Sequence, residues 1–186
     1  MNIIKYPKPS EWPHIITRPH LDVTQLNDTV AAVLADVKQH GDDAVRKYEE
    51  RFDHAQLTSL AVTEDEIAQA ERETPADLLA AIRLAHHNIA KFHEAQRFAP
   101  LKVETAQGVT CWQKSVPIER VGLYIPGGTA PLFSTVLMLA TPAKIAGCKE
   151  IVLCTPPGKD GKVNPAILVA AHEAGVSRIF KAGGIQ

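Results

Sequence analysis

The sequence has neither a strong excess of charge nor an apolar run long enough to cross a membrane. Its 20 Lys and Arg residues nearly balance 21 Asp and Glu residues, which leaves a formal net charge of −1 at pH 7. A polyanion such as DNA is therefore not favoured as a partner. No apolar stretch approaches the roughly 20 residues that a transmembrane helix needs. The amino terminus also lacks the apolar core of a secretory signal and the Arg- and Ser-rich composition of a transit peptide. These absences predict a cytoplasmic protein that acts without nucleic acid or membrane.

Cysteine is scarce, and its arrangement does not suit a disulfide framework. The three residues, Cys111, Cys148 and Cys154, are odd in number and form no CxxC pair. Cys148 and Cys154 lie in apolar stretches, where a thiol behaves as a small hydrophobic group. We therefore expect buried, reduced thiols rather than reactive ones, in agreement with a reducing compartment.

Several short motifs that would identify a chemistry are also missing. No GxGxxG follows a predicted strand and no Gly-Lys-Ser/Thr ends a glycine-rich turn, so the standard dinucleotide fingerprint and the P-loop are both absent. There is no HExxH zinc motif and no GxSxG nucleophile elbow. His86 and His93 are seven positions apart beside an apolar helical stripe, where packing is favoured over zinc binding, and His87 is expected to face solvent. The residue patterns therefore assign no catalytic and no metal-binding residue.

The first half of the chain, residues 22 to 98, has the periodicity of helices. Apolar residues recur at helical spacing before Gly41, and a shorter helix is predicted from about Asp42. Thr63 and Glu66 form a capping-box pattern. Thr74 and Pro75 predict the cap and first residue of a longer helix. The apolar positions of these helices are Val30, Val33, Leu34 and Val37, then Val45, Tyr48 and Phe52, and finally Leu78, Ile82, Ala85, Ile89 and Phe92.

The second half alternates between strand and helix patterns. A β-hairpin near residues 102–114, turning at Gln107-Gly108, is expected to connect the two halves. Short apolar runs then predict three strands, at 121–125, 150–154 and 178–182, separated by helices at 133–146 and 164–174. Apolar strands joined by helices indicate right-handed crossovers and a parallel sheet. The fold class is therefore α/β, with a helical part over 1–115 and a Rossmann-like β-α-β-α-β unit over 116–186.

Three turns follow these strands, at the sheet edge where ligands bind in open α/β folds. They are residues 126–131, 155–158 and 183–186, and each contains glycine. Glycines at this edge either allow backbone to approach a ligand or simply form tight turns, and the pattern alone favours neither. Only Ile185 and Gln186 follow the last glycine pair, although a parallel sheet needs further helices to cover it. We therefore expect an incomplete unit that belongs to a larger enzyme.

One long segment resembles the histidinol dehydrogenase family. The resemblance runs from Arg120 through Val-Gly-Leu-Tyr-Ile-Pro-Gly-Gly-Thr-Ala-Pro-Leu-Phe-Ser to Cys148, and continues through Ile151-Val-Leu-Cys-Thr-Pro-Pro157. It extends upstream to Gly41-Asp-Asp-Ala-Val45, Tyr48, Arg51-Phe-Asp53, Phe92-His-Glu94 and Gln96. The resemblance identifies the chain as the amino-terminal portion of such an enzyme.

The resemblance implies an NAD-dependent oxidation of L-histidinol to L-histidine through the aldehyde, the last step of histidine biosynthesis. It also implies a homodimer, one zinc per active site and an atypical Rossmann-like nucleotide domain. Two NAD-contacting residues of the family match Tyr124 and Gln186, although Ile185 stands where the family usually has alanine. The family's zinc ligands and its Glu–His acid/base pair match no residue of this chain, so we assign none as catalytic or metal-binding and expect the chain alone to be inactive.

Two alternatives remain open at this point. The chain could be an interaction module that kept the first domains of the family without its chemistry. It could also belong to a related dehydrogenase of another alcohol, because the substrate-reading residues of the family match no segment here. A dimer that does not respond to NAD would favour the first alternative.

Overall fold

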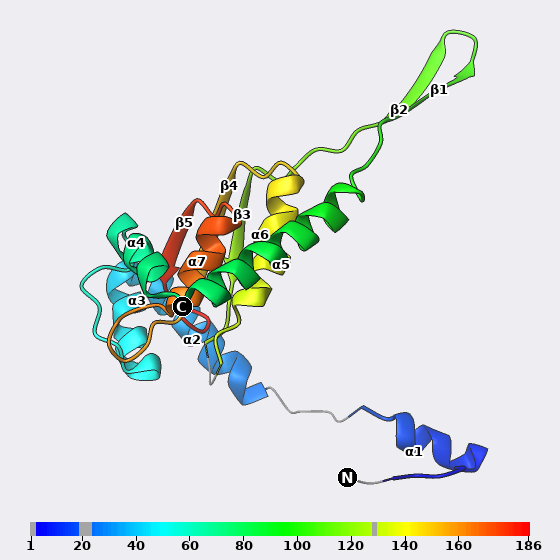
Figure 1. Ribbon diagram of the computed structural model, residues 1–186. Coiled ribbons are helices and arrows are strands. Elements are labelled where there is room, and N and C mark those ends of the chain that lie inside the picture. The colour runs from blue at the N-terminus through cyan, green and yellow to red at the C-terminus, as the bar shows by residue number, and fades with distance from the viewer. Residues whose placement is uncertain (1–2, 19–23, 128–129) are drawn as a thin grey trace.

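The computed structural model describes residues 3–18, 24–127 and 130–186. A body of helices and strands lies at the centre, with a long hairpin projecting at one end and an amino-terminal arm at the other (Figure 1). The arm contains the short turn η1 (Pro9–Glu11) and helix α1 (Trp12–Ile16), neither of which buries a residue. Among the described residues, no helix is long and apolar enough to span a membrane.

The first half is helical, as its periodicity predicted. It contains α2 (Thr24–His40), α3 (Asp42–Tyr48), a π-helical turn η2 (Glu49–Asp53), α4 (Glu64–Glu73) and α5 (Ala76–Glu94). Residues 54–63 differ from this prediction, because part of them runs antiparallel to the last strand of the sheet. The Val62 amide donates to the Ile179 carbonyl at 3.0 Å, and the Lys181 amide donates to the Leu60 carbonyl at 2.7 Å. This segment therefore satisfies backbone groups along the strand's outer edge.

The start of α4 agrees with its predicted capping residues, and the start of α5 differs from its prediction by one residue. The predicted capping box is confirmed, because the Glu66 amide donates to Thr63 Oγ1 at 3.2 Å and the Thr63 amide donates to Glu66 Oε2 at 2.9 Å. The second start is shifted by one residue. Pro75 is the cap of α5 rather than its first residue, and Thr74 ends α4, where its hydroxyl donates to the Ala70 carbonyl at 2.7 Å.

Helices α2 and α3 are joined by a small core and a polar brace. Val33, Ala44 and Tyr48 are buried together. Asp36 accepts hydrogen bonds from Lys47 Nζ and from the Tyr48 hydroxyl, each at 2.8 Å. With a third hydrogen bond from His40, these contacts hold the pKa of the Asp36 carboxyl well below its ordinary value. Tyr48 thus serves both the apolar and the polar contact between the two helices.

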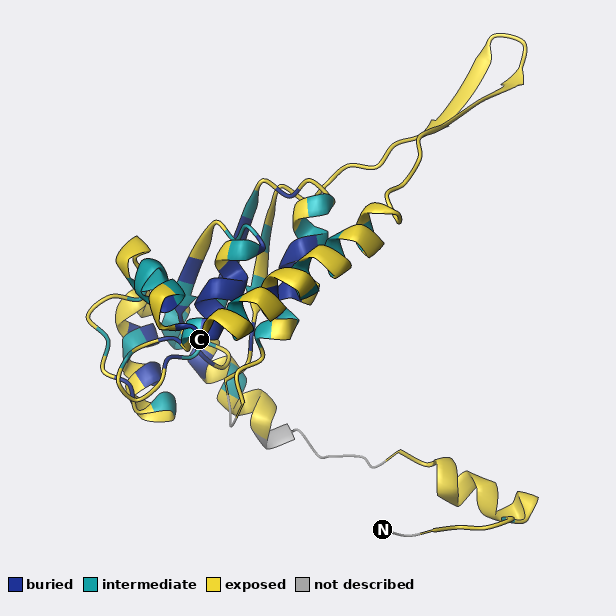
Figure 2. Ribbon diagram, viewed as in Figure 1, coloured by how far each residue is buried: buried dark blue, intermediate teal, exposed yellow. Residues whose placement is uncertain are grey.

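The predicted parallel unit is also confirmed. Strands β3 (Arg120–Tyr124), β4 (Glu150–Thr155) and β5 (Arg178–Lys181) form one parallel sheet in that order, and helices α6 (Phe133–Ile145) and α7 (Pro165–Glu173) connect them. One face of the sheet packs against α6 and α7, where most of the buried residues lie (Figure 2). Helix α5 then packs on α6, and α4 on α7. The predicted division at residues 115 and 116 stays a prediction.

The predicted hairpin is present and stands apart from the core. Strands β1 (Leu101–Ala106) and β2 (Val109–Gln113) pair antiparallel, and Gly108 turns between them with a φ of +79° that favours glycine. Every residue of both strands is exposed (Figure 2). The exposed side chains include Trp112, at 71%. The hairpin therefore contributes no buried residue to the body of this chain.

Candidate functional site

The three turns at the carboxyl edge of the sheet meet around Pro156. A Cβ at Gly127 would lie 2.4 Å from Pro156 Cγ, and a Cβ at Gly183 would lie 2.7 Å from Pro156 Cβ. Both distances are too short for a larger residue, so these glycines allow the outer turns to pack on the middle one. Gly128 and Thr129 of the first turn lie outside the described residues.

Tyr124 and the 183–186 turn are joined directly. The Gly184 amide donates to the Tyr124 hydroxyl at 3.0 Å, although the two residues come from the first and the last part of the parallel unit. Tyr124 remains 43% exposed, so its ring is open to a ligand. The structure therefore places Tyr124 in contact with the turn that contains Gln186, the other residue predicted to bind the cofactor.

A third residue, Glu49 of η2, holds that turn from inside the protein. Glu49 is 0% exposed, and its Oε1 accepts from the Gly183 amide and from Gln186 Nε2, each at 2.7 Å. Burial raises the pKa of the Glu49 carboxyl, the two hydrogen bonds oppose this effect, and the charge of Asp53 adds to it. Its other oxygen, Oε2, is buried without a hydrogen-bond partner among the described residues.

Sequence reasoning did not single out Glu49, although a signal was present. Glu49 lies four positions after Val45 and one after Tyr48, on the side of the helix predicted to be apolar. A carboxyl group at such a position is buried only when a hydrogen-bonding partner meets it. The partners themselves lie 134 and 137 positions further along the chain, where no local pattern points to them.

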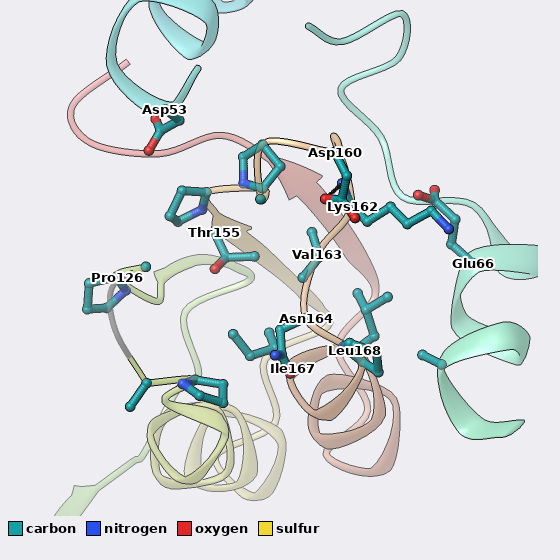
Figure 3. A pocket seen from close by; sticks show the side chains of 18 of the residues that line it. Asp53, Glu66, Pro126, Thr155, Asp160, Lys162, Val163, Asn164, Ile167 and Leu168 are labelled. Carbon is teal, nitrogen blue, oxygen red and sulfur yellow. Dashed lines mark hydrogen bonds between the residues drawn. The ribbon is translucent and has the colours of Figure 1, made fainter. Parts of the chain in front are cut away.

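A cavity of about 830 Å³ opens beside these turns. Figure 3 shows Asp53 and Pro126 on one side, Glu66 on the opposite side and Thr155 between them. Four carboxyl groups line the cavity, and among the described lining residues Lys162 is the only cation. The carboxyl groups are those of Asp53, Glu66, Glu73 and Asp160.

The polar groups of the cavity differ in how well they are satisfied. Lys181 Nζ donates to Glu66 Oε1 at 2.5 Å. Burial disfavours ionisation of Glu66, but this hydrogen bond and that from the Thr63 amide bring its pKa below the ordinary value. At the start of α7, Asn164 Oδ1 accepts from the Ala166 amide. In contrast, Thr155 Oγ1 is buried and has no partner among the described residues.

The three histidines that the sequence analysis considered and assigned no role lie outside this site. His86 and His93 are partly buried and His87 is exposed, as expected for helix-boundary residues. Over the described ranges, no group of three or more His, Cys, Asp and Glu residues could hold a metal ion.

All three thiols are free. Cys148 is buried, and burial raises the pKa of the partly buried Cys154, with the charge of Glu49 adding to the effect. The expectation of buried thiols was wrong for Cys111, which lies exposed on the hairpin.

The fold and the cavity define an α/β protein with a cavity at the carboxyl edge of a parallel sheet, the edge at which open α/β folds bind their ligands. The family model described as "Histidinol dehydrogenase" matches residues 16–186. The chain therefore belongs to the histidinol dehydrogenase family.

Individual relatives agree with this assignment. Histidinol dehydrogenase of Bacteroides fragilis is 65% identical over 186 residues, which are 100% of this chain and 44% of that protein. The enzyme of Salmonella typhimurium is 48% identical over 179 residues, 96% of this chain and 40% of its own. A crystal structure of histidinol dehydrogenase from Elizabethkingia anophelis superimposes with a TM-score of 0.92 at 48% identity, covering 97% of this chain and 42% of the other. The chain thus spans less than half the length of these relatives.

Proposed function

We propose that this chain supplies the NAD-binding part of a cytoplasmic histidinol dehydrogenase, which oxidises L-histidinol to L-histidine through the aldehyde. Each of the two oxidations would transfer one hydride to NAD⁺. The observation that carries the proposal is the meeting of Tyr124 with the 183–186 turn beside a cavity of about 830 Å³. We further propose that residues 116–186 begin the atypical Rossmann-like domain and that residues 1–115 belong to a first domain.

Two features of the site fit a dinucleotide. The Tyr124 hydroxyl accepts from the Gly184 amide, so its own proton is available to a ligand acceptor. The buried hydroxyl of Thr155 and the buried Oε1 of Gln186 have no partner among the described residues, and such groups require one. A nucleotide rich in hydroxyl and amide groups would satisfy them. When bound, NAD⁺ supplies the hydride acceptor.

Zinc is implied by the family, but the described residues do not fit it. They contain no cluster of three or more His, Cys, Asp and Glu side chains suitable for a metal ion. No step of the proposed reaction is therefore assigned to a metal held by these residues. The role supported here is binding and orientation of the nucleotide.

Two measurements on the 186-residue chain test the proposal. We expect NAD⁺ to raise its melting temperature in a concentration-dependent manner, because a ligand that binds only the folded state stabilises it. We expect no NADH absorbance to develop on addition of L-histidinol. Absence of any NAD⁺-induced shift would count against the proposed site and favour an interaction module. Clear histidinol-dependent NADH formation would contradict the expectation that this chain is inactive alone.

We also propose that the chain forms a homodimer through its hairpin. The hairpin carries apolar residues that no part of the body covers, among them Val103, Val109 and Trp112 at 45%, 51% and 71% exposure. Exposed apolar side chains gathered on one element are typical of contact surfaces. A second copy of the chain is the partner that the family resemblance implies.

A further inference from the structure

The side chain of Gln186 is held in one orientation. Its Nε2 donates to Glu49 Oε1 at 2.7 Å, whereas its Oε1 is buried and without a partner among the described residues. A carboxamide can be turned over so that its oxygen and nitrogen exchange places. Here a turned amide would point its oxygen at the carboxylate of Glu49, which only accepts hydrogen bonds when ionised. The carboxylate therefore selects the orientation in which Oε1 faces away from it.

Tyr124, unlike Gln186, is left with a free hydrogen-bond donor by its neighbour in the fold. Its hydroxyl accepts from the Gly184 amide, so the phenolic proton is not used in that contact. The 183–186 turn and the adjoining Tyr124 therefore carry one unsatisfied acceptor, the buried Gln186 Oε1, and one donor, the Tyr124 hydroxyl. A ligand bound against both must offer a donor and an acceptor in return.

We propose that Glu49 is a positioning residue of the cofactor site, which fixes the Gln186 carboxamide so that its Oε1 accepts a hydrogen bond from the nucleotide. This inference rests on the proposed NAD-binding function, and it adds to the site a residue that does not touch the ligand. A hydroxyl of a ribose or the amide of a nicotinamide ring has the required N–H or O–H donor.

The surroundings of Glu49 explain why it can act in this way. The π-helical turn η2 places the side chain inside the protein, and its Oε1 accepts from two donors of the same turn, the Gly183 amide and Gln186 Nε2. The charged group that acts on it most clearly is Asp53, which repels it, and Cys154 lies close enough to respond to its charge. A buried carboxyl in such surroundings depends strongly on its hydrogen-bond donors. The 183–186 turn is therefore tied to η2 through this one oxygen.

The test compares NAD⁺ dissociation constants, measured by titration calorimetry, in variants of the full 186-residue chain. Glu49→Leu keeps the approximate size and removes the acceptor of Gln186 Nε2, and we expect NAD⁺ binding to weaken by about tenfold or more because the Gln186 carboxamide loses the partner that orients it. Glu49→Gln retains an acceptor oxygen and should restore affinity to within about threefold of the wild type. Glu50→Gln is the matched control, since Glu50 is the exposed neighbour in the same turn, and it should bind NAD⁺ as the wild type does.

A double variant separates positioning from a general loss of structure. If Glu49 acts through Gln186, adding Glu49→Leu to Gln186→Leu should change the dissociation constant by less than about twofold, because residues acting as one unit are not additive. An undiminished tenfold effect in the Gln186→Leu background would overturn the proposal, and so would unchanged affinity in Glu49→Leu. If the wild-type chain itself does not bind NAD⁺, the proposed function fails first, which is a distinct result.

A second measurement remains decisive if Glu49→Leu does not fold. In nuclear magnetic resonance spectra of the ligand-free wild type, the Gly183 amide and the Gln186 side-chain amide should titrate together with the Glu49 carboxyl. Asp53 and Cys154 are the other titratable groups acting nearby, and both remain in Glu49→Gln. The shared titration should vanish in that variant, and its persistence there would refute the link between Glu49 and Gln186.

Discussion

Glu49 and Asp36 show how the same residue type acquires opposite properties from its neighbours. Asp36 accepts from three side chains, so its pKa lies well below the ordinary value. Glu49 is fully buried, and desolvation outweighs its two hydrogen bonds, so its pKa lies above the ordinary value. Burial disfavours the charged form of a carboxyl group, whereas hydrogen-bond donors favour it.

The raised pKa of Glu49 predicts a defined dependence of stability on pH. A carboxyl that holds its proton more tightly in the folded state contributes stability that is fully present below its ordinary pKa of 4.5 and is lost as pH rises through the raised value. Glu49→Gln mimics the protonated form and cannot lose a proton. We therefore expect the melting temperature of Glu49→Gln minus that of the wild type to increase with pH.

Differential scanning calorimetry over a pH series measures this difference. Glu50→Gln serves as the control, because it removes an exposed carboxyl group from the same turn, and the increase with pH seen for Glu49→Gln should exceed any change seen for Glu50→Gln. If the difference for Glu49→Gln stays constant or falls with rising pH, ionisation of Glu49 does not destabilise the folded protein.

Tyr124 leads to a second prediction at the residue scale. Tyr124→Phe removes the hydroxyl that contacts the 183–186 turn and is proposed to contact the nucleotide. We expect NAD⁺ affinity to fall by about tenfold, which is ~1.4 kcal/mol. The ring is 43% exposed, so the melting temperature without ligand should change little.

Calorimetric titration of Tyr124→Phe with NAD⁺ provides the measurement. Tyr6→Phe is a suitable control, because Tyr6 is 98% exposed on the amino-terminal arm and should bind NAD⁺ normally when replaced. Equal affinities of Tyr124→Phe and the wild type would remove Tyr124 from the proposed site.

At the scale of elements, the capping box of α4 both starts the helix and contacts the edge of the sheet. Thr63 starts α4, and Glu66 of the same box also accepts from Lys181 at the end of β5. The segment just before it pairs with β5 through the Val62 amide. The start of α4 is therefore joined to the sheet edge both by backbone and by an ion pair, at the rim of the cavity.

Loss of the cap should destabilise the protein measurably. Thr63→Ala removes the side-chain acceptor of the Glu66 amide, and we expect a decrease of about 1 kcal/mol in the free energy of unfolding. Urea denaturation should show a lower midpoint with an unchanged slope. Thr58→Ala, at an exposed position of the preceding loop, should unfold like the wild type. Equal midpoints for Thr63→Ala and Thr58→Ala would mean that the capping box contributes nothing to stability.

At the scale of the whole molecule, the hairpin is the element least explained by the chain itself. Figure 1 shows it extending away from the body. An isolated two-stranded hairpin is at best marginally stable in water, so a covering partner would add to its stability. The proposed homodimer supplies such a partner.

Trp112 provides the test of that proposal. We expect the wild type to sediment as a dimer and Trp112→Glu to raise the dimer dissociation constant by about thirtyfold or more, ~2 kcal/mol, since buried tryptophans dominate interface energies. Gln113→Glu adds the same charge on the same strand without removing an aromatic ring, and should remain dimeric. Sedimentation equilibrium measures both. If the wild type sediments as a monomer, the proposed homodimer is wrong. If Trp112→Glu remains a dimer, the dimer is not formed through the hairpin.

The sequence by itself determined the elements and the family. Helical period, the capping box at Thr63 and the apolar runs of the three strands act over a few residues, so they can be recognised without the fold. The cofactor residues Tyr124 and Gln186 were predicted from the resemblance rather than from spacing, and their contact with a nucleotide stays a prediction. The cap of α5 was misplaced by one residue, because Thr74 serves the end of the preceding helix instead.

Only the tertiary structure decided what surrounds the turns at the sheet edge. The packing of Gly127 and Gly183 on Pro156 gives these glycines a role in the close approach of one turn to another, which the sequence analysis did not consider. The burial of Glu49 and its contact with Gln186 join positions 137 residues apart. Such contacts depend on how the strands and helices pack, and no local period encodes them. The helices and strands could therefore be predicted from the sequence, whereas the arrangement of hydrogen-bond donors and acceptors at the site was decided by tertiary packing.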